Sequence, residues 1–187
     1  MTQLIKEGLL ARVEIINISN QPQIAEQFNI RSVPYTRIGD IAFEGVKNIM
    51  EIKQLIEQSV SIEGITSHLH QQLADGDLAM VEKTVMQKPE YLSYLLPLLD
   101  KQETAMQVRV GIGAILETMA TDSDLNYLLP SLIQLSRSES TATRSDATYY
   151  LSLLQSTEAR KYIRERLNDA DPGVREIAQE SLPPDSA

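Results

Sequence analysis

Few residues of this 187-residue chain have the types and spacing that a reaction centre needs. The sequence contains no cysteine, which excludes disulfides, thiolate zinc sites and cysteine nucleophiles within it. His68 and His70 are two residues apart on a predicted helix and point to different faces, whereas paired ligands on a helix usually lie three or four residues apart. Serine and threonine are frequent in residues 136–148, but no histidine stands near them to complete a triad. We therefore expect no catalytic residue, no metal site and no cofactor.

Charge and composition argue against two further classes of function. The chain has 17 basic and 26 acidic residues, a formal net charge of -9, and such a field repels phosphate backbones, so we expect no nucleic-acid partner. No apolar run reaches the length of a membrane-spanning helix, and the first residues do not resemble a secretory signal. We expect a cytoplasmic protein with no membrane partner.

The hydrophobic pattern changes near residue 60. Residues 1–60 alternate between strand and helix signals and predict an α-β-α-β-β-α order. Gly39-Asp40 separates two β-branched runs and predicts a hairpin turn. The expected elements are a helix in 1–10, a strand in 13–18, a helix between Asn20 as its cap and Asn29 as its stop, strands in 30–38 and 41–45, and a helix from residue 49.

From Ser61 onward the strand signals vanish. Apolar residues recur every three or four positions, which predicts about eight short helices. This part has 11 basic and 19 acidic residues and therefore carries nearly all of the net negative charge. We expect two domains, an α+β domain in 1–60 and an all-α domain in 61–187.

The all-α part contains an internal repeat. The motif Tyr94–Leu99 recurs as Tyr127–Leu132, with Pro97 of the first copy matched by Pro130 of the second, and a weaker copy follows at Tyr162–Leu167. A period in the thirties built from two helices is typical of an α-solenoid. After each copy comes a polar turn and a second helix that opens near an arginine, at Arg109, Arg144 and Arg175.

The last copy resembles a known repeat family. Residues 167–178, Leu-Asn-Asp-Ala-Asp-Pro-Gly-Val-Arg-Glu-Ile-Ala, are similar to a HEAT repeat of the phycobilisome-lyase type, and the weaker resemblance extends over residues 89–182. The resemblance implies a ladder in which Arg175 pairs with Asp169 or Asp171, while Arg109 and Arg144 hold equivalent positions. The turn of the middle copy offers only one carboxylate, Glu139.

The first part resembles the later portion of a thioredoxin fold. Val13–Gly45 contains a strand, a helix and then Ile30-Arg31-Ser32-Val33-Pro34 opening a hairpin. The resemblance implies that Pro34 follows a cis peptide bond and that the backbone at Val33 binds an extended chain. It makes Ser32–Tyr35 a candidate binding edge. An ordinary edge-strand proline is the alternative.

The thioredoxin resemblance is incomplete. The family's first strand and its Cys-x-x-Cys motif would precede Met1, and that strand would lie between the strands predicted at Val13–Ile18 and Tyr35–Ile38. Three explanations stay open. The start is misplaced or the chain clipped, the sheet repairs itself by re-pairing or by swapping with a second chain, or the domain is a remnant stabilised by docking on the helices.

These observations lead to competing expectations of function. The first is a non-catalytic scaffold that binds a protein or peptide, with its acidic helices favouring a basic partner. The alternative is an enzyme, a thioredoxin-family thiol-disulfide oxidoreductase whose first strand and Cys-x-x-Cys are missing from this chain. A third is self-association, a homodimer formed through open sheet edges.

Overall fold

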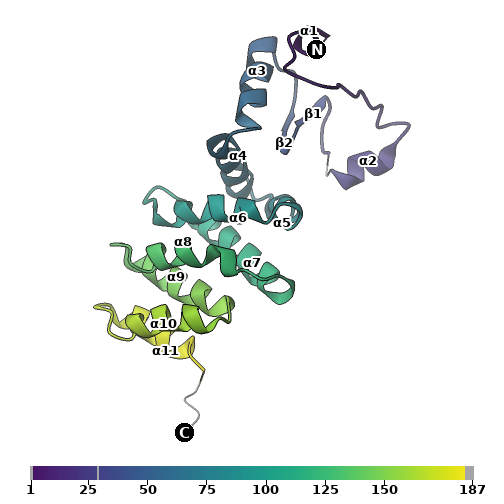
Figure 1. Cartoon of the computed structure of the whole chain (residues 1–187). Helices are drawn as coiled ribbons and strands as arrows, with labels where there is room; N and C mark the ends of the chain where they lie inside the picture. The colour runs from purple at the N-terminus through teal and green to yellow at the C-terminus, as the bar shows by residue number, and fades with distance from the viewer. Residues whose placement is uncertain (1, 29, 184–187) are drawn as a thin grey trace. The chain divides into compact units, whose positions relative to one another are not determined.

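The structure, a computed structural model, describes residues 2–28 and 30–183 (Figure 1). The chain divides into two compact units, unit 1 (Met1–His68) and unit 2 (Leu69–Ala187). The division falls within α4 (Ile62–Ala74), later in the chain than the boundary expected at residue 60. Unit 1 combines helices with a small sheet, whereas the described part of unit 2 contains helices and no strand. The coarse expectation of an α+β part followed by an all-α part is therefore confirmed.

Unit 1 contains the expected β-hairpin. β1 (Tyr35–Ile38) pairs antiparallel with β2 (Ile41–Glu44), so that Tyr35 lies opposite Glu44 and Ile38 opposite Ile41. Gly39 opens the two-residue turn with a φ of 58°, a left-handed conformation that glycine adopts without steric cost. The helices are α1 (Thr2–Lys6), α2 (Pro22–Gln27), α3 (Ile49–Gln58) and the first half of α4.

The predicted strand at Val13–Ile18 is wrong. These residues form neither helix nor strand, and the sheet of the described chain consists of β1 and β2 alone. The side chain of Ile15 is 91% exposed. A β-branched run favours an extended backbone, but it becomes a strand only when a neighbouring strand accepts and donates its hydrogen bonds. No such neighbour lies beside these residues in the described chain.

Side-chain capping marks the start of α3, whereas a proline marks the start of α2. Asn48 accepts hydrogen bonds at the start of α3, and the Glu51 side chain accepts one from the Asn48 amide, a capping box. At α2 the cap is Gln21 rather than the predicted Asn20, because Pro22 takes the first helical position. The predicted stop, Asn29, lies outside the described residues.

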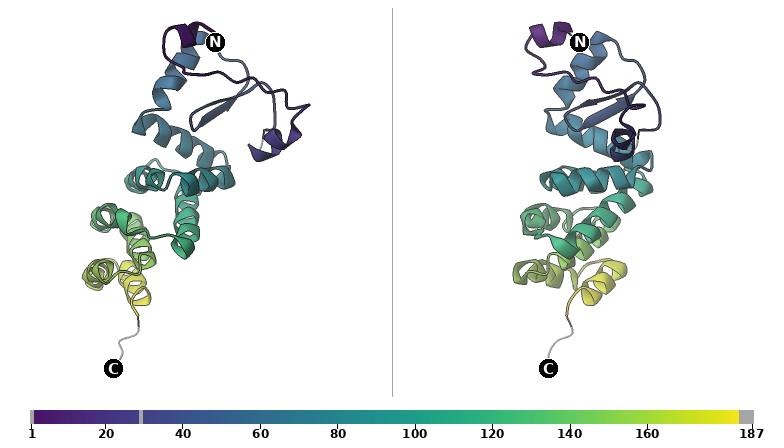
Figure 2. Two further views of the ribbon diagram at one scale, coloured as in Figure 1. Left: turned by 45° about the vertical axis from the view of Figure 1, so that its right-hand side comes forward. Right: turned by 90° about the vertical axis from the view of Figure 1, so that its right-hand side faces the viewer.

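Unit 2 is a succession of short helices in two layers. In the views of Figures 1 and 2, α6, α8 and α10 follow one another in one layer, and α7, α9 and α11 form the second. Helix α9 contacts α7, α8, α10 and α11. The elements are α5 (Leu78–Gln87), α6 (Glu90–Leu95), the 3-10 segment η1 (Leu96–Asp100), α7 (Met106–Asp122), the 3-10 segment η2 (Asn126–Leu128), α8 (Leu129–Leu135), α9 (Thr141–Leu153), α10 (Thr157–Arg166) and α11 (Pro172–Glu180).

The prolines of the repeated motif alter its helices. Pro97 lies in η1, which continues α6 in a tighter form, and Pro130 lies in the first turn of α8, directly after η2. A proline has no N–H for the carbonyl four residues earlier, and its ring crowds that carbonyl. The third copy carries no proline and forms one unbroken helix, α10.

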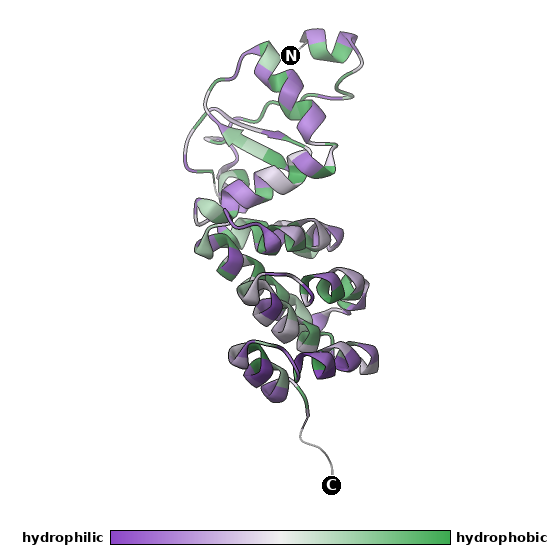
Figure 3. Ribbon diagram, turned by 90° about the vertical axis from the view of Figure 1, so that its left-hand side faces the viewer, coloured by the Kyte–Doolittle hydropathy of each residue, from purple (hydrophilic) through white to green (hydrophobic). Residues whose placement is uncertain are grey.

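The core of unit 2 is aliphatic, as the composition predicts. Hydrophobic residues run along α7 (Figure 3), where Val108, Ile112, Ile115 and Leu116 are fully buried. Two glycines permit close packing against this helix. A Cβ on Gly111 would lie 2.8 Å from Leu73 Cδ2, and one on Gly113 would lie 2.7 Å from the hydroxyl of Tyr150.

Candidate functional site

The predicted binding edge, Ser32–Tyr35, leads directly into β1. The Val33–Pro34 peptide bond is cis, as the resemblance to thioredoxins implied. The Gly45 amide donates to the carbonyl of Pro34 at 2.8 Å, which carries the hairpin pairing one residue beyond the strands. The side chain of Val33 is 65% exposed. The structure thus places these four residues together, with an apolar side chain open to solvent.

The Glu44 carboxylate forms a hydrogen bond with Ser32, the first residue of this edge. The Ser32 hydroxyl donates to Glu44 Oε2 at 2.5 Å, and this hydrogen bond is the main reason that the pKa of Glu44 lies below its ordinary value. Tyr35 is half-buried, and burial raises the pKa of its phenol. The edge therefore presents main-chain groups and neutral hydroxyls beside one anion. A carboxylate whose pKa is lowered is a weak base, so the Ser32–Glu44 pair is poorly suited to activate the hydroxyl as a nucleophile.

In unit 2 the three repeated arginines make the same kind of contact. Each guanidinium donates to main-chain carbonyls at the end of the preceding first helix or in the turn that follows it. These bonds join Arg109 to Leu99, Arg144 to Ser138 and Glu139 at 3.0 Å each, and Arg175 to Asp169 and Ala170 at 2.7 and 3.0 Å. Such charge-assisted bonds satisfy carbonyls that a helix end leaves without partners.

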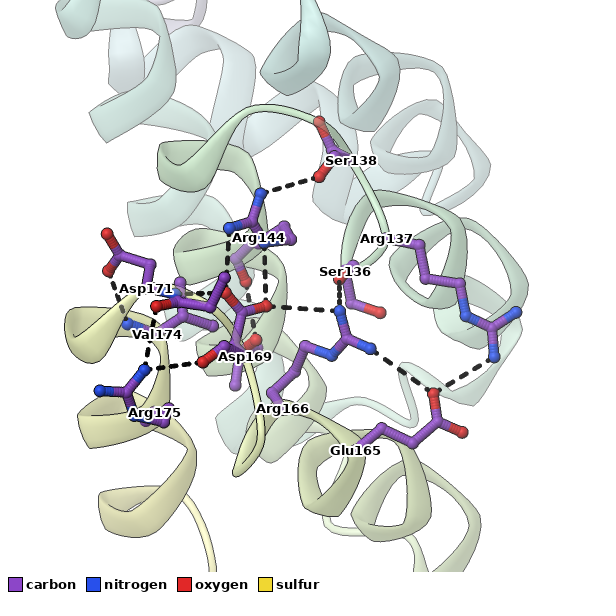
Figure 4. Close-up of polar contacts among 12 residues, drawn as sticks. Ser136, Arg137, Ser138, Arg144, Glu165, Arg166, Asp169, Asp171, Val174 and Arg175 are labelled. Atoms are coloured by element: carbon purple, nitrogen blue, oxygen red, sulfur yellow. Dashed lines mark hydrogen bonds and ion pairs between the residues drawn. The ribbon is translucent and has the colours of Figure 1, made fainter.

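Two of these arginines also reach the next pair of helices. Arg109 Nη2 donates to Asp146 Oδ2 on α9 at 2.6 Å. Arg144 forms a fork with Asp169, which lies in the turn before α11 (Figure 4). The same side chain therefore ties its own turn to a carboxylate of the following pair, at two successive steps of the repeat.

Asp169 is the most heavily bonded carboxylate of this network. Its side chain is 4% exposed and accepts the Arg144 fork, the amide of Asp171 at 3.0 Å and a longer contact from Arg166 at 3.5 Å. Arg166 also donates to the Ser136 carbonyl at 2.9 Å (Figure 4). The hydrogen bond from Arg144 is the main cause that lowers the pKa of Asp169. The carboxylate is thus held ionised in a nearly closed site.

The carboxylate partners differ from those that the repeat resemblance implied. The Arg175 guanidinium donates to the main-chain carbonyl of Asp169. The side chain of Asp169 accepts from Arg144 instead. The Asp171 side chain caps α11 by accepting from the amides of Gly173 and Val174. In the middle copy, Glu139 contributes its carbonyl to Arg144. The side-chain carboxylate that Arg144 contacts therefore comes from Asp169 of the next copy.

Two members of the network were missed by sequence reasoning. Asp146 stands two residues after Arg144, a spacing that gives no sign of its bond to Arg109, 37 residues earlier. Arg166 stands outside the repeated arginine positions, yet its mostly buried side chain lies 3.5 Å from Asp169 Oδ2. Asp146 is also two positions from Arg144 on α9, so it lies on a different face of that helix from the ladder arginine.

A groove lies between α9 and α11. We call it the α9–α11 groove, and its lining residues are Ser145, Asp146, Tyr149, Ser152, Ile177, Glu180 and Ser181. Tyr149 is 39% exposed, and its hydroxyl donates to Glu117 of α7 at 3.0 Å. Burial is the main cause that raises the pKa of Tyr149, and Glu117 adds to it. The groove thus combines one aromatic ring, hydroxyls and carboxylates.

The two histidines do not form a metal site in the described chain. His68 Nε2 accepts a long hydrogen bond from the Ala42 amide at 3.4 Å, and burial lowers the pKa of this imidazole. Within the described residues, no three metal-ligating side chains of the His, Cys, Asp or Glu type come together. The His68 imidazole thus connects α4 to β2 through the Ala42 amide.

Comparison of the chain with models of protein families, with curated proteins and with solved structures finds no match. Over residues 2–28 and 30–183, no helix combines the length and the apolar character that a membrane span requires.

Proposed function

We propose that this chain is a non-catalytic protein-binding module. In this proposal unit 2 is a short HEAT-like helical repeat, and unit 1 is a thioredoxin-like segment that offers a strand edge at Ser32–Tyr35. The observation that carries the proposal is the repeated arginine ladder. Arg109 and Arg144 each join their own turn to a carboxylate of the next pair of helices.

A ladder of this kind supports a stacked repeat for a physical reason. A pair of short helices cannot bury its apolar face alone and gains its core only from its neighbours. A guanidinium has a fixed fork geometry, so bonds to a turn on one side and a carboxylate on the other set both the spacing and the rotation of adjacent pairs. The layer α7, α9 and α11 then becomes one continuous face, which is the usual binding surface of such proteins.

The charge on this face favours a basic partner. Glu117, Asp146 and Glu180 lie in or beside the α9–α11 groove, and Arg109 is already paired with Asp146. The part of the chain from residue 61 onward carries 19 acidic and 11 basic residues. Complementary charge steers association and selects partners more than it adds affinity. A protein or peptide with exposed lysine or arginine beside apolar residues fits this surface.

Capture of partners from a lysate of the native cell tests the proposal. The immobilised full chain should enrich a defined protein, and Glu117→Lys and Glu180→Lys should each weaken its recovery because they reverse charges at the groove. Glu103→Lys, in the loop before α7, is the matched control and should leave recovery unchanged. No protein above background at any salt concentration, or equal recovery by all variants, would contradict the proposal.

A further inference from the structure

Unit 1 contains a strand-like segment that has no strand beside it. Val13–Ile18 has four β-branched residues among six, and its trace runs from α1 toward α2 without regular structure (Figure 1). Among the described residues, none of its amides donates a hydrogen bond to another backbone group. Ile15 and Ile16 are exposed. Only its last two carbonyls are bonded to backbone amides, Asn17 accepting from Asn20 at 3.0 Å and Ile18 from Gln21 at 3.3 Å. The segment therefore has the composition of a strand and amides that no strand partner receives.

Unit 1 also contains a sheet edge that has no covering strand. The turn makes Ile38 and Ile41 a hydrogen-bonded pair, so alternation along the ladder turns the main-chain groups of Tyr35 and Arg37 away from β2. On the far side of the hairpin, the Ala42 amide is taken by His68. The amides of Tyr35 and Arg37 donate to no other backbone group among the described residues, so the outer edge of β1 presents N–H and C=O groups with which a further strand can pair.

We propose that two copies of this chain pair by exchanging these elements, with Val13–Ile18 of each copy adding as a strand to the outer edge of β1 in the other. The inference rests on the part of the proposed function that gives unit 1 a strand edge, and it names the occupant of that edge. The chain carries both the unpaired segment and the unpaired edge, yet it does not join them within one copy. A reciprocal exchange satisfies both elements in both copies and closes the assembly at two.

The small core of unit 1 gives such an exchange a further driving force. Of the hydrophobic side chains buried in the described structure, three belong to unit 1, Leu4, Ile41 and Ile65, and the other 28 belong to unit 2. A two-stranded hairpin is at best marginally stable by itself, and a third strand with a hydrophobic face is what makes a sheet independent. Addition of Val13–Ile18 supplies that strand and covers Ile15 or Ile16.

The oligomeric state of the full chain tests the inference. Size-exclusion chromatography with light scattering should give the mass of two chains, falling toward the mass of a single chain on dilution. Ile15→Pro removes an amide from the added strand, and Arg37→Pro removes one from the receiving edge. Each should weaken dimerisation by about tenfold or more, because ladder hydrogen bonds are lost. Ala11→Pro, just before the segment, is the control and should leave the dimer intact.

A mixing experiment separates strand exchange from a folding defect. Ile15→Pro keeps the receiving edge and Arg37→Pro keeps the donating segment, so a mixture of the two should form a mixed dimer with one of the two exchanged strands. Amide exchange should slow at Tyr35 and Arg37 in the wild-type dimer and be fast in Ile15→Pro alone.

A wild-type chain that stays monomeric at every concentration would overturn the inference. So would a dimer that Ile15→Pro leaves unchanged, or a mixture that shows no mixed dimer. These outcomes leave partner capture by the α9–α11 groove unaffected, so the failure of one proposal can be told from the failure of the other.

Discussion

Arg144 and Asp169 face each other through two hydrogen bonds of equal length, Nε to Oδ2 and Nη2 to Oδ1, each 2.9 Å. The two residues come from successive copies of the repeat and lie 25 positions apart in the chain. This forked geometry fixes both the distance and the orientation between α9 and the turn before α11. The contact therefore acts as a structural joint of unit 2 and not as a reactive pair.

Removal of the Asp169 charge should destabilise unit 2 strongly. Asp169→Asn leaves the Arg144 guanidinium in a mostly closed site without its anion, and breaking a buried pair in this way costs about 3 kcal/mol. Urea unfolding followed by circular dichroism measures the loss. Glu165→Gln is the control, since Arg137 and Glu165 form an exposed pair worth about 1 kcal/mol or less. Equal losses in both variants would contradict the structural role of the fork.

The same carboxylate should make stability depend on acidity. Its pKa in the folded protein is lowered, mainly by Arg144, from an unfolded value of about 4. The ionised group then adds stability that is fully present above about pH 4 and is lost as the pH falls through the lower, folded value. Asp169→Asn does not titrate in this range. The difference in unfolding free energy between wild type and variant should thus be constant near neutral pH and shrink in acid.

Urea titrations of both proteins across that range check this expectation. Glu7 and Glu44 of unit 1 also have lowered pKa values, but they are present in both proteins and cancel in the difference. A difference that stays constant well into the acid range, or that grows there, would show that Asp169 is not held ionised by Arg144.

Gly64 should resist replacement by alanine although it lies in a helix. Alanine is favoured over glycine inside a helix by about 1 kcal/mol. A Cβ at Gly64 of α4, however, would lie 2.3 Å from the main-chain oxygen of Gln58 in α3, which cannot move as a side-chain tip can. We expect Gly64→Ala to lower the melting temperature of unit 1. Ser67→Ala, at an exposed position of α4, should not, and a stabilised Gly64→Ala would refute the close approach.

Thr143 should contribute one buried hydrogen bond to the stacking of unit 2. Its hydroxyl, on α9, donates to the carbonyl of Leu99 at 2.7 Å, which also accepts from Arg109. Thr143→Val keeps the shape and removes the donor, with an expected loss of about 1 kcal/mol. Thr121→Val is the matched control, because Thr121 is exposed and bonds within its own helix. Denaturant midpoints of the two variants should differ, and equal midpoints would count against the contact.

Much of unit 2 could be predicted from local patterns. Apolar spacing of three and four residues indicates helices directly, and the arginines at 109, 144 and 175 marked the start of each second helix. The partners of those arginines could not be predicted in the same way. The turn around Glu139 offers one carboxylate, whereas Arg144 finds Asp169 in the following copy. An ion-pair partner that is brought near only by the stacking of helices leaves no pattern in the residues around the arginine.

Unit 1 shows the opposite balance. The hairpin was predictable, because the Gly39-Asp40 turn and the runs on either side are local signals. The absence of a strand at Val13–Ile18 could not be predicted, because residue preference decides only whether a backbone can be extended. Whether it becomes a strand depends on a neighbour elsewhere in the chain or in another chain.

The sequence alone excludes cysteine chemistry within this chain and indicates its helical segments, since residue type and hydrophobic spacing act over a few positions. It contains no cysteine, and nearly all of its net negative charge lies after residue 60. The tertiary structure alone decides that Arg109 meets Asp146 across 37 residues and that Asp169 is buried under two arginines. Those contacts arise from the stacking of whole helices, and the free energy of that stacking is shared among residues that no short stretch of sequence brings together.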